Sequence, residues 1–184
     1  MLWLEDELEI NFPYPGTVQE EYPGLIAAGG NLLPNNLISA YKKGLFPWYS
    51  EGEPILWWSP DPRMILLPEK VRKQAEVIKI LEDPGIEIRI NSNPEAIIRA
   101  CATVSRKDQM GTWINEDIVA SYSQLAKENL VYCIGLYENH YLQAGLYGLK
   151  IGSIFFGESM FTRISNGSKA CLVWLCEHLK NEIS

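Results

Sequence analysis

Few of the 184 residues are of the kinds that build metal centres or disulfide frameworks. The chain has four cysteines, none in a C-x-x-C pair, and only two histidines, His140 and His178. That usage favours reduced thiols in a core over a zinc site or a set of disulfides. The sequence also lacks a G-x-S-x-G turn, a P-loop and a Cys–His pair at a suggestive spacing. We therefore expect neither a covalent nucleophile nor a bound metal.

Long apolar runs and a positive net charge are missing too. No stretch approaches the about 20 apolar residues of a membrane span, and the opening segment MLWLEDELEI is acidic, unlike a signal peptide. We expect a soluble, cytoplasmic protein without membrane contact. The formal net charge is −7. This charge argues against tight binding of nucleic acid, because cationic contacts to phosphates supply much of that affinity.

What the sequence does have is a stretch of unusual composition, residues 24–63. It holds three of the six tryptophans, Trp48, Trp57 and Trp58. Prolines at 47, 54, 60 and 62 restrict the backbone, which predicts a stiff loop over residues 46–63. Indole rings on such a loop offer a rigid surface to a ligand. They can equally well fill a core, and the sequence leaves both interpretations open for each ring.

Periodicity and turn residues predict an α+β fold with an antiparallel sheet flanked by helices. We expect an extended segment over 1–23, a short strand starting at residue 64 and a polar loop over 105–111. Helices are expected at 34–43, 69–82, 94–103, 116–128 and 166–181, and further strands at 86–90, 131–138, 141–150 and 153–159. A small N-terminal lobe, residues 1–63, would precede a domain of residues 64–184.

Several motifs carry a family resemblance. GLIAAGGNL, AYKKGLFPW and LWWSPDPR are followed in order by GTWI (111–114), YGL (147–149), FFGESMF (155–161) and SK (168–169). In these strings the chain resembles the leucyl/phenylalanyl-tRNA–protein transferases, from residue 12 to about residue 180. The resemblance implies an acetyltransferase-like (GNAT) core, which a three-strand meander followed by an amphipathic helix also fits.

A GNAT-like fold raises the question of acetyl-CoA. Such enzymes cradle pyrophosphate in a Q/R-x-x-G-x-G/A turn after the meander. Here Arg163 is followed by Asn166 in the first glycine position, and Gly167 comes one place late. We therefore disfavour acetyl-CoA as a cofactor and expect none.

The resemblance implies an aminoacyltransferase. It would move Leu, Phe or a similar apolar residue from aminoacyl-tRNA to the N-terminal Arg or Lys of a protein, tagging that protein for degradation under the N-end rule. Its partners would be an aminoacyl-tRNA and a protein with a basic N-terminus. The ester of an aminoacyl-tRNA is already activated, so orientation and help with one proton transfer are enough for an amine to attack it.

Matching motifs assign roles to three residues. Trp48 would stack on the terminal adenosine, and Trp113 would line the same entrance. Glu158 would hydrogen-bond the nucleoside end or orient the reacting amine, and is the candidate catalytic residue. A carboxylate at the end of a strand can instead pair with Arg163 or Lys169, and that alternative stays open.

The transferred side chain would lie in an apolar pocket. The matching positions are Leu146, Met160, Leu172, Leu175 and Leu179. Leucines at helical spacing are also typical of an ordinary core, so the sequence does not decide between the two. The tRNA backbone would contact Arg72, Lys73 and Lys79. The family is more basic in this segment, and Ala75 and Ile78 occupy positions where it would have basic residues.

The family continues past the last helix into a strand with an I-D-C-Q segment, whose Asp and Gln are candidates for proton handling. The sequence given stops at Ser184, before that strand. We expect a C-terminally shortened member whose open sheet edge favours a homodimer. The alternative function is a non-catalytic relative that binds aminoacyl-adenosine or a basic N-terminus.

Overall fold

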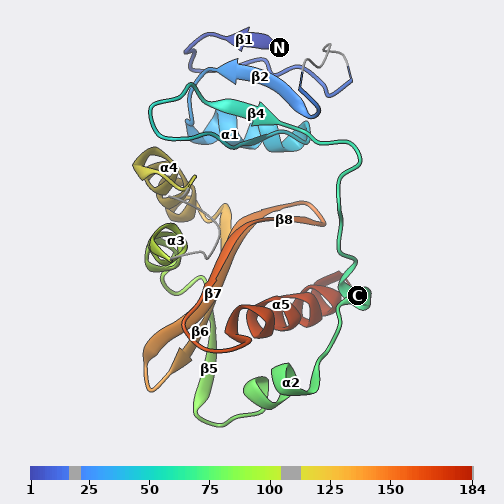
Figure 1. Ribbon diagram of the computed structural model, residues 1–184, viewed down its shortest axis with the longest axis vertical. Coiled ribbons are helices and arrows are strands. Elements are labelled where there is room, and N and C mark those ends of the chain that lie inside the picture. Colours follow the sequence, from blue (N-terminus) through green and yellow to red (C-terminus); the bar gives the residue numbers. More distant parts are fainter. Residues whose placement is uncertain (17–21, 105–112, 184) are drawn as a thin grey trace. The chain divides into compact units, whose positions relative to one another are not determined.

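The computed structural model describes residues 1–16, 22–104 and 113–183. These residues form a mixed α+β protein with two four-stranded sheets (Figure 1). The chain divides into two compact units. Unit 1 is Met1–Met64 with Met110–Ser121, and unit 2 is Ile65–Gln109 with Tyr122–Ser184. Unit 1 thus takes in a later segment as well as the residues expected in the N-terminal lobe.

Unit 1 is built on a mixed sheet in the order β1–β2–β4–β3. Its strands are β1 (Leu2–Leu4), β2 (Leu25–Gly29), β3 (Phe46–Pro47) and β4 (Leu56–Trp58). β1 runs parallel to β2, whereas β2 and β3 each pair antiparallel with β4. The loop predicted over 46–63 therefore contains two strands, and the prediction of irregular structure throughout was wrong. Proline is compatible with a strand this short and at a sheet edge, as β3 is.

Helix α1 (Pro34–Lys42) belongs to unit 1 and begins at a proline, a residue whose fixed φ suits the first helical turn. Gly44 follows it with a left-handed φ of 81°, the backbone conformation that commonly ends a helix at a glycine. Asn36 on this helix is only 1% exposed. Its amide accepts a hydrogen bond from the Ile10 backbone N–H (2.8 Å) and donates to the Glu7 carbonyl (3.0 Å). These bonds hold the acidic N-terminal segment against α1.

Unit 2 is built on an antiparallel meander in the order β5–β6–β7–β8. The strands are β5 (Ile86–Ile90), β6 (Val131–Glu138), β7 (Tyr141–Ile151) and β8 (Ile154–Thr162). This confirms the expected antiparallel strands, with β8 extending to Thr162. Asn139 and His140 join β6 to β7 with φ values of 49° and 68°, the backbone that tight two-residue hairpin turns require.

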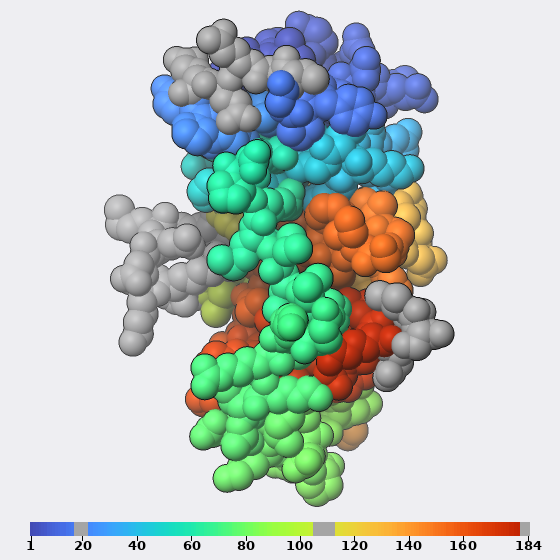
Figure 2. All heavy atoms as spheres, turned by 90° about the vertical axis from the view of Figure 1, so that its right-hand side faces the viewer, coloured from blue at the N-terminus to red at the C-terminus, as the bar shows by residue number. Residues whose placement is uncertain are grey.

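Helices α3 (Pro94–Thr103) and α5 (Gly167–Ile183) cover opposite faces of this sheet (Figure 1). On the α5 face, the core includes Ile134, Leu146 and Leu175. Helix α2 (Ala75–Leu81) packs on the outer side of α5, and Figure 2 shows green atoms of this region lying against the red atoms of α5. Helix α4 (Glu116–Lys127) begins in unit 1 and ends in unit 2.

The segment between the two units departs from the prediction. A short strand was expected from Met64 and a helix from residue 69. The structure has a single 3-10 turn, η1 (Pro68–Lys70), and α2 begins only at Ala75. Met64 is 96% exposed, and the apolar residues after it are exposed as well. An apolar run forms a strand only where another strand pairs with it. The polar loop expected over 105–111 lies outside the described residues.

Candidate functional site

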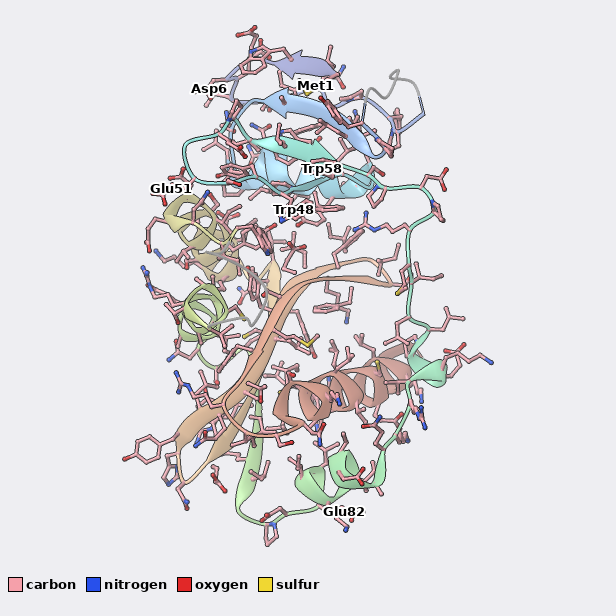
Figure 3. All side chains as sticks on the ribbon, viewed as in Figure 1. Met1, Asp6, Trp48, Glu51, Trp58 and Glu82 are labelled. Carbon is pink, nitrogen blue, oxygen red and sulfur yellow. The ribbon has the colours of Figure 1, made fainter. Side chains whose placement is uncertain are left out.

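Trp48 lies in unit 1, directly after β3, and its side chain is 50% exposed. Its backbone N–H donates to the Leu56 carbonyl (2.9 Å), and its carbonyl accepts a hydrogen bond from the Trp58 indole N–H (2.7 Å). The Trp48 and Trp58 rings meet edge to face with centroids 5.7 Å apart (Figure 3). A fixed backbone with an exposed indole gives a rigid platform on which a flat ligand can stack.

The neighbouring Trp57 has the opposite environment. It is fully buried, its indole N–H donates to the Gly29 carbonyl (2.9 Å), and its ring meets Phe12 edge to face at 4.6 Å. Side chains alternate across a strand, so β4 sends Trp57 into the core and Trp58 towards Trp48. The two interpretations left open by the sequence therefore apply to different rings: Trp57 fills the core, and Trp48 is available to a ligand.

Trp113 also belongs to unit 1, where it is partly buried just before helix α4. The cap of that helix is Asn115, whose side-chain oxygen accepts from the Ile118 N–H at 3.0 Å. The same oxygen accepts a long hydrogen bond from the Tyr49 hydroxyl at 3.5 Å. Burial raises the pKa of Tyr49, so this hydroxyl stays protonated and able to donate. The residue after Trp48 is thereby tied to the segment that carries Trp113.

Glu158 lies in unit 2, at an irregularity in the pairing of β7 with β8. Tyr147 pairs with Ser159, and Gly148 pairs with Gly157, so the residue between the two β8 partners has no counterpart on β7. Glu158 is this extra residue, which makes the site a β-bulge. Bulges redirect side chains and occur often beside active sites. A carboxylate placed in this way supports the functional interpretation of Glu158.

The carboxylate of Glu158 is held by Tyr122 on α4. The Tyr122 hydroxyl donates to Glu158 Oε2 at 3.3 Å, and its fully buried ring meets Tyr147 edge to face at 5.7 Å. The sequence predicted the helix that carries Tyr122 but did not single out this residue. A tyrosine in a core position could have suggested this contact, because a buried tyrosine hydroxyl usually needs a hydrogen-bond partner.

The two cations proposed as alternative partners of Glu158 make other contacts. Arg163 donates to the Leu142 carbonyl at 2.8 Å and lies over the Phe161 ring. Lys169 donates to the side-chain oxygen of Asn166 at 2.9 Å.

The five apolar candidates gather in unit 2 around the packing of α5 on the sheet. Leu146 and Leu175 are buried members of the core cluster, and Leu172 and Leu179 are partly buried against it. Met160 pairs with Leu146 across β7 and β8 and is 41% exposed. Leu146 and Leu175 thus pack in the core, and Met160 is the most exposed of the five and the most accessible to a ligand.

The three basic candidates, Arg72, Lys73 and Lys79, are all exposed. Lys73 forms an ion pair with Glu177 (2.9 Å), which also binds Lys180 (2.6 Å). Those two lysines lower the pKa of Glu177, so it stays ionised. Its negative charge offsets part of the positive charge of Lys73, which lowers the attraction of this surface for phosphate.

Among the described residues, no three His, Cys, Asp or Glu side chains come together as a metal site would require. The described cysteines are buried, and burial raises the pKa of Cys133 to about 11 and that of Cys171 to about 12. Buried thiols of this kind are poor nucleophiles. In the described part of the chain, no helix is both long and apolar enough to span a membrane.

Comparison with known proteins places these residues in a family. A sequence model described as leucyl/phenylalanyl-tRNA protein transferase matches residues 65–183, and a model of that protein's N-terminal domain matches residues 30–61. Similar proteins include leucyl/phenylalanyl-tRNA–protein transferases from three bacteria. The relative from Teredinibacter turnerae is 40% identical over 97% of this chain and 69% of its own length. The one from Paraburkholderia xenovorans is 46% identical over 86% of this chain and 66% of its own length.

The third relative, from Syntrophus aciditrophicus, is 43% identical over 93% of this chain and 71% of its own length. The chain thus spans about two thirds of the length of these relatives. Both family models and high identity over nearly the whole chain agree with the motifs around Trp48 and Glu158. The chain belongs to the leucyl/phenylalanyl-tRNA–protein transferase family.

Proposed function

We propose that the protein transfers Leu or Phe from aminoacyl-tRNA to the N-terminal Arg or Lys of a protein. The observation that carries this proposal is the identity of 40% to a leucyl/phenylalanyl-tRNA–protein transferase over 97% of the chain. The acceptor would be a protein marked in this way for degradation in the cytoplasm, where aminoacyl-tRNA is made. The acidic balance of the chain suits a cationic acceptor.

The reaction is an aminolysis. A bond forms between the acceptor nitrogen and the ester carbon, the bond from that carbon to the ribose oxygen breaks, and one proton passes from the amine to the departing oxygen. Trp48, exposed on a fixed backbone, would stack on the terminal adenine, with Trp113 at the same entrance. Glu158, held by Tyr122, would accept a hydrogen bond from the amine and orient it. Positioning of this kind supplies much of the rate gain in bimolecular reactions.

We assign the transferred side chain to the apolar set that includes Leu172, Leu179 and Met160. Arg72, Lys73 and Lys79 would make loose contacts with the tRNA backbone, and their number predicts a shallow dependence of affinity on salt. We further propose that residues 64–184 form a GNAT-like domain after an N-terminal lobe of residues 1–63. The order β5–β6–β7–β8 followed by α5 supports this proposal.

A homodimer through the edge strand β8 stays a prediction. β8 is the last strand in the described sheet order, and Ile154 on it is exposed. Unpaired strand edges favour pairing with another chain. Sedimentation at tens of micromolar would show a dimer that a charged substitution, Ile154→Lys, weakens; a clean monomer for the unaltered chain would exclude it.

Transfer is tested by incubating the protein with leucyl-tRNA and a peptide that has an N-terminal Arg, and by looking for the Leu-extended peptide by mass. Trp48→Ala should raise the KM for leucyl-tRNA about 5- to 150-fold, the value of one stacked base. Trp3→Ala removes an equally exposed indole of the same unit and should leave KM unchanged. No extended peptide from the unaltered protein, or equal effects of both substitutions, would contradict the proposal.

A further inference from the structure

The β-bulge in β8 determines which face of the sheet Glu158 uses. Residues two apart on a regular strand share a face, so Glu158 would share the face of Met160. Met160 pairs with Leu146, which lies in the core cluster under α5. Counted from Met160, a regular β8 would therefore direct the carboxylate towards that apolar cluster, whereas counted from Gly157, the partner of Gly148, it would direct the carboxylate to the opposite face. The extra residue lets both halves of β8 keep these two registers with β7. The observed carboxylate instead reaches Tyr122, whose ring packs on Tyr147, the neighbour of Leu146 on the opposite face.

The bulge in turn depends on how closely β7 and β8 approach at Gly148. A Cβ atom on Gly148 would lie 2.1 Å from the Phe156 carbonyl oxygen and 2.6 Å from the Phe155 ring. Contacts of a Cβ below 3.0 Å are essentially never seen, and the nearest atom here is backbone, which cannot turn away. Gly148 has no left-handed φ, so the requirement is one of space. Any side chain at position 148 would force the two strands apart where the extra residue is accommodated.

We propose that Gly148 is a positioning residue for Glu158. Its missing side chain lets β8 approach β7 with one extra residue, and that residue is turned towards Tyr122 and away from the apolar core. One consequence rests on the proposed function: aminoacyl transfer should slow when Glu158 is misplaced. Its structural part is independent of any activity and is tested first.

The structural test measures coupling between Glu158 and Tyr122 labelled as 3-fluorotyrosine. In the otherwise unaltered protein, Glu158→Gln should shift the fluorine resonance of Tyr122. In the Gly148→Ala variant, the same substitution should leave that resonance unshifted. Gly145→Ala is the matched control, because a Cβ there also clashes with a backbone oxygen of the same sheet, Ile134 O at 2.9 Å, away from the bulge. In that control the Glu158→Gln shift should persist. A shift that persists in Gly148→Ala would overturn the proposal.

A second variant keeps the test decisive if Gly148→Ala unfolds. Deletion of Glu158 removes the one residue without a counterpart, so Ser159 and Gly157 follow each other opposite Tyr147 and Gly148 in regular pairing. Gly148→Ala should then be tolerated better in the deletion background than in the full chain, by at least tenfold in the unfolding equilibrium constant. Equal destabilisation in both backgrounds would show that the clash is unrelated to the bulge.

The kinetic consequence is a fall in kcat without a matching rise in KM for leucyl-tRNA. Gly148→Ala should lower kcat as far as Glu158→Gln does, about a hundredfold if the carboxylate assists proton transfer. Gly145→Ala, assayed well below its unfolding temperature, should keep kcat within about threefold of the unaltered protein. If the unaltered protein shows no transfer, the proposed function fails, and the fluorine coupling still decides the role of Gly148.

Discussion

Asn36→Ala should destabilise unit 1 strongly, because the buried amide of Asn36 is fully used. The change removes the acceptor for the Ile10 N–H and the donor to the carbonyl of Glu7 and to Asn31 Oδ1, at 2.8, 3.0 and 2.7 Å. Each lost donor bond is worth about 0.5–1.5 kcal/mol, and the orphaned N–H of the buried Ile10 costs about 1–3 kcal/mol more. The better helix propensity of alanine returns about 0.5 kcal/mol. These contributions predict a net loss of about 1.5–5.5 kcal/mol.

The assay is urea unfolding followed by tryptophan emission. Trp174 is the single tryptophan outside unit 1, so the signal reports mainly that unit. Asn35→Ala makes the same chemical change on the exposed side of the same helix and should stay within about 0.5 kcal/mol of the unaltered protein. Asn36→Asp keeps the volume and the acceptor for Ile10 but loses both donated bonds, so it should also destabilise. If Asn36→Ala unfolds at the same urea concentration as Asn35→Ala, the reasoning is refuted.

Three further predictions concern unit 2. The pKa of Cys133 is raised to about 11 from 9.0 by burial, so the unfolded chain releases this proton first as pH rises. The free energy of unfolding should therefore fall between about pH 9 and pH 11, by up to about 1.4 kcal/mol per pH unit for each such thiol, and Cys133→Ala should flatten that slope in urea titrations. Glu177→Gln removes a half-exposed ionic partner of Lys73, so it should change the free energy of unfolding by less than about 1 kcal/mol. It should also raise the affinity for tRNA at low salt, measured by filter binding. Unchanged binding would contradict the proposed contact. Tyr122→Phe removes only the hydroxyl that binds Glu158 and should lower kcat of peptide transfer with little change in KM; a purely structural role would instead lower the unfolding temperature and leave kcat intact.

Local sequence signals identified most of unit 2. The strands predicted at 131–138 and 141–150 correspond to β6 and β7, which meet at the Asn139–His140 turn. The helices predicted at 94–103 and 116–128 correspond to α3 and α4, which are capped by Asn93 and Asn115. Each of these features is specified by residues that are neighbours in the sequence. Turns, helix caps and hydrophobic periodicity depend on neighbouring residues, so they can be predicted from the sequence alone.

The strands of unit 1 were harder to predict from the sequence. β2 is buried along most of its length, so it lacks the alternation that marks a strand with one exposed face. Prolines concealed β3 and β4, and a run of apolar residues at 64–67 suggested a strand where the structure has none. Strands depend on partners that are distant in the sequence, and no local pattern shows whether such a partner exists.

The sequence by itself determined the family, through motifs such as LWWSPDPR and FFGESMF, and with it the residue types available for chemistry. It could not separate the core ring of Trp57 from the exposed ring of Trp48, nor show which face of the sheet Glu158 uses. Tertiary structure decided both. The first depends on the pairing of β4 between β2 and β3, and the second on one extra residue in β8 opposite a glycine of β7. Because a shift of one residue moves a side chain to the other face of a sheet, only the register between strands distant in sequence places the carboxylate beside Tyr122.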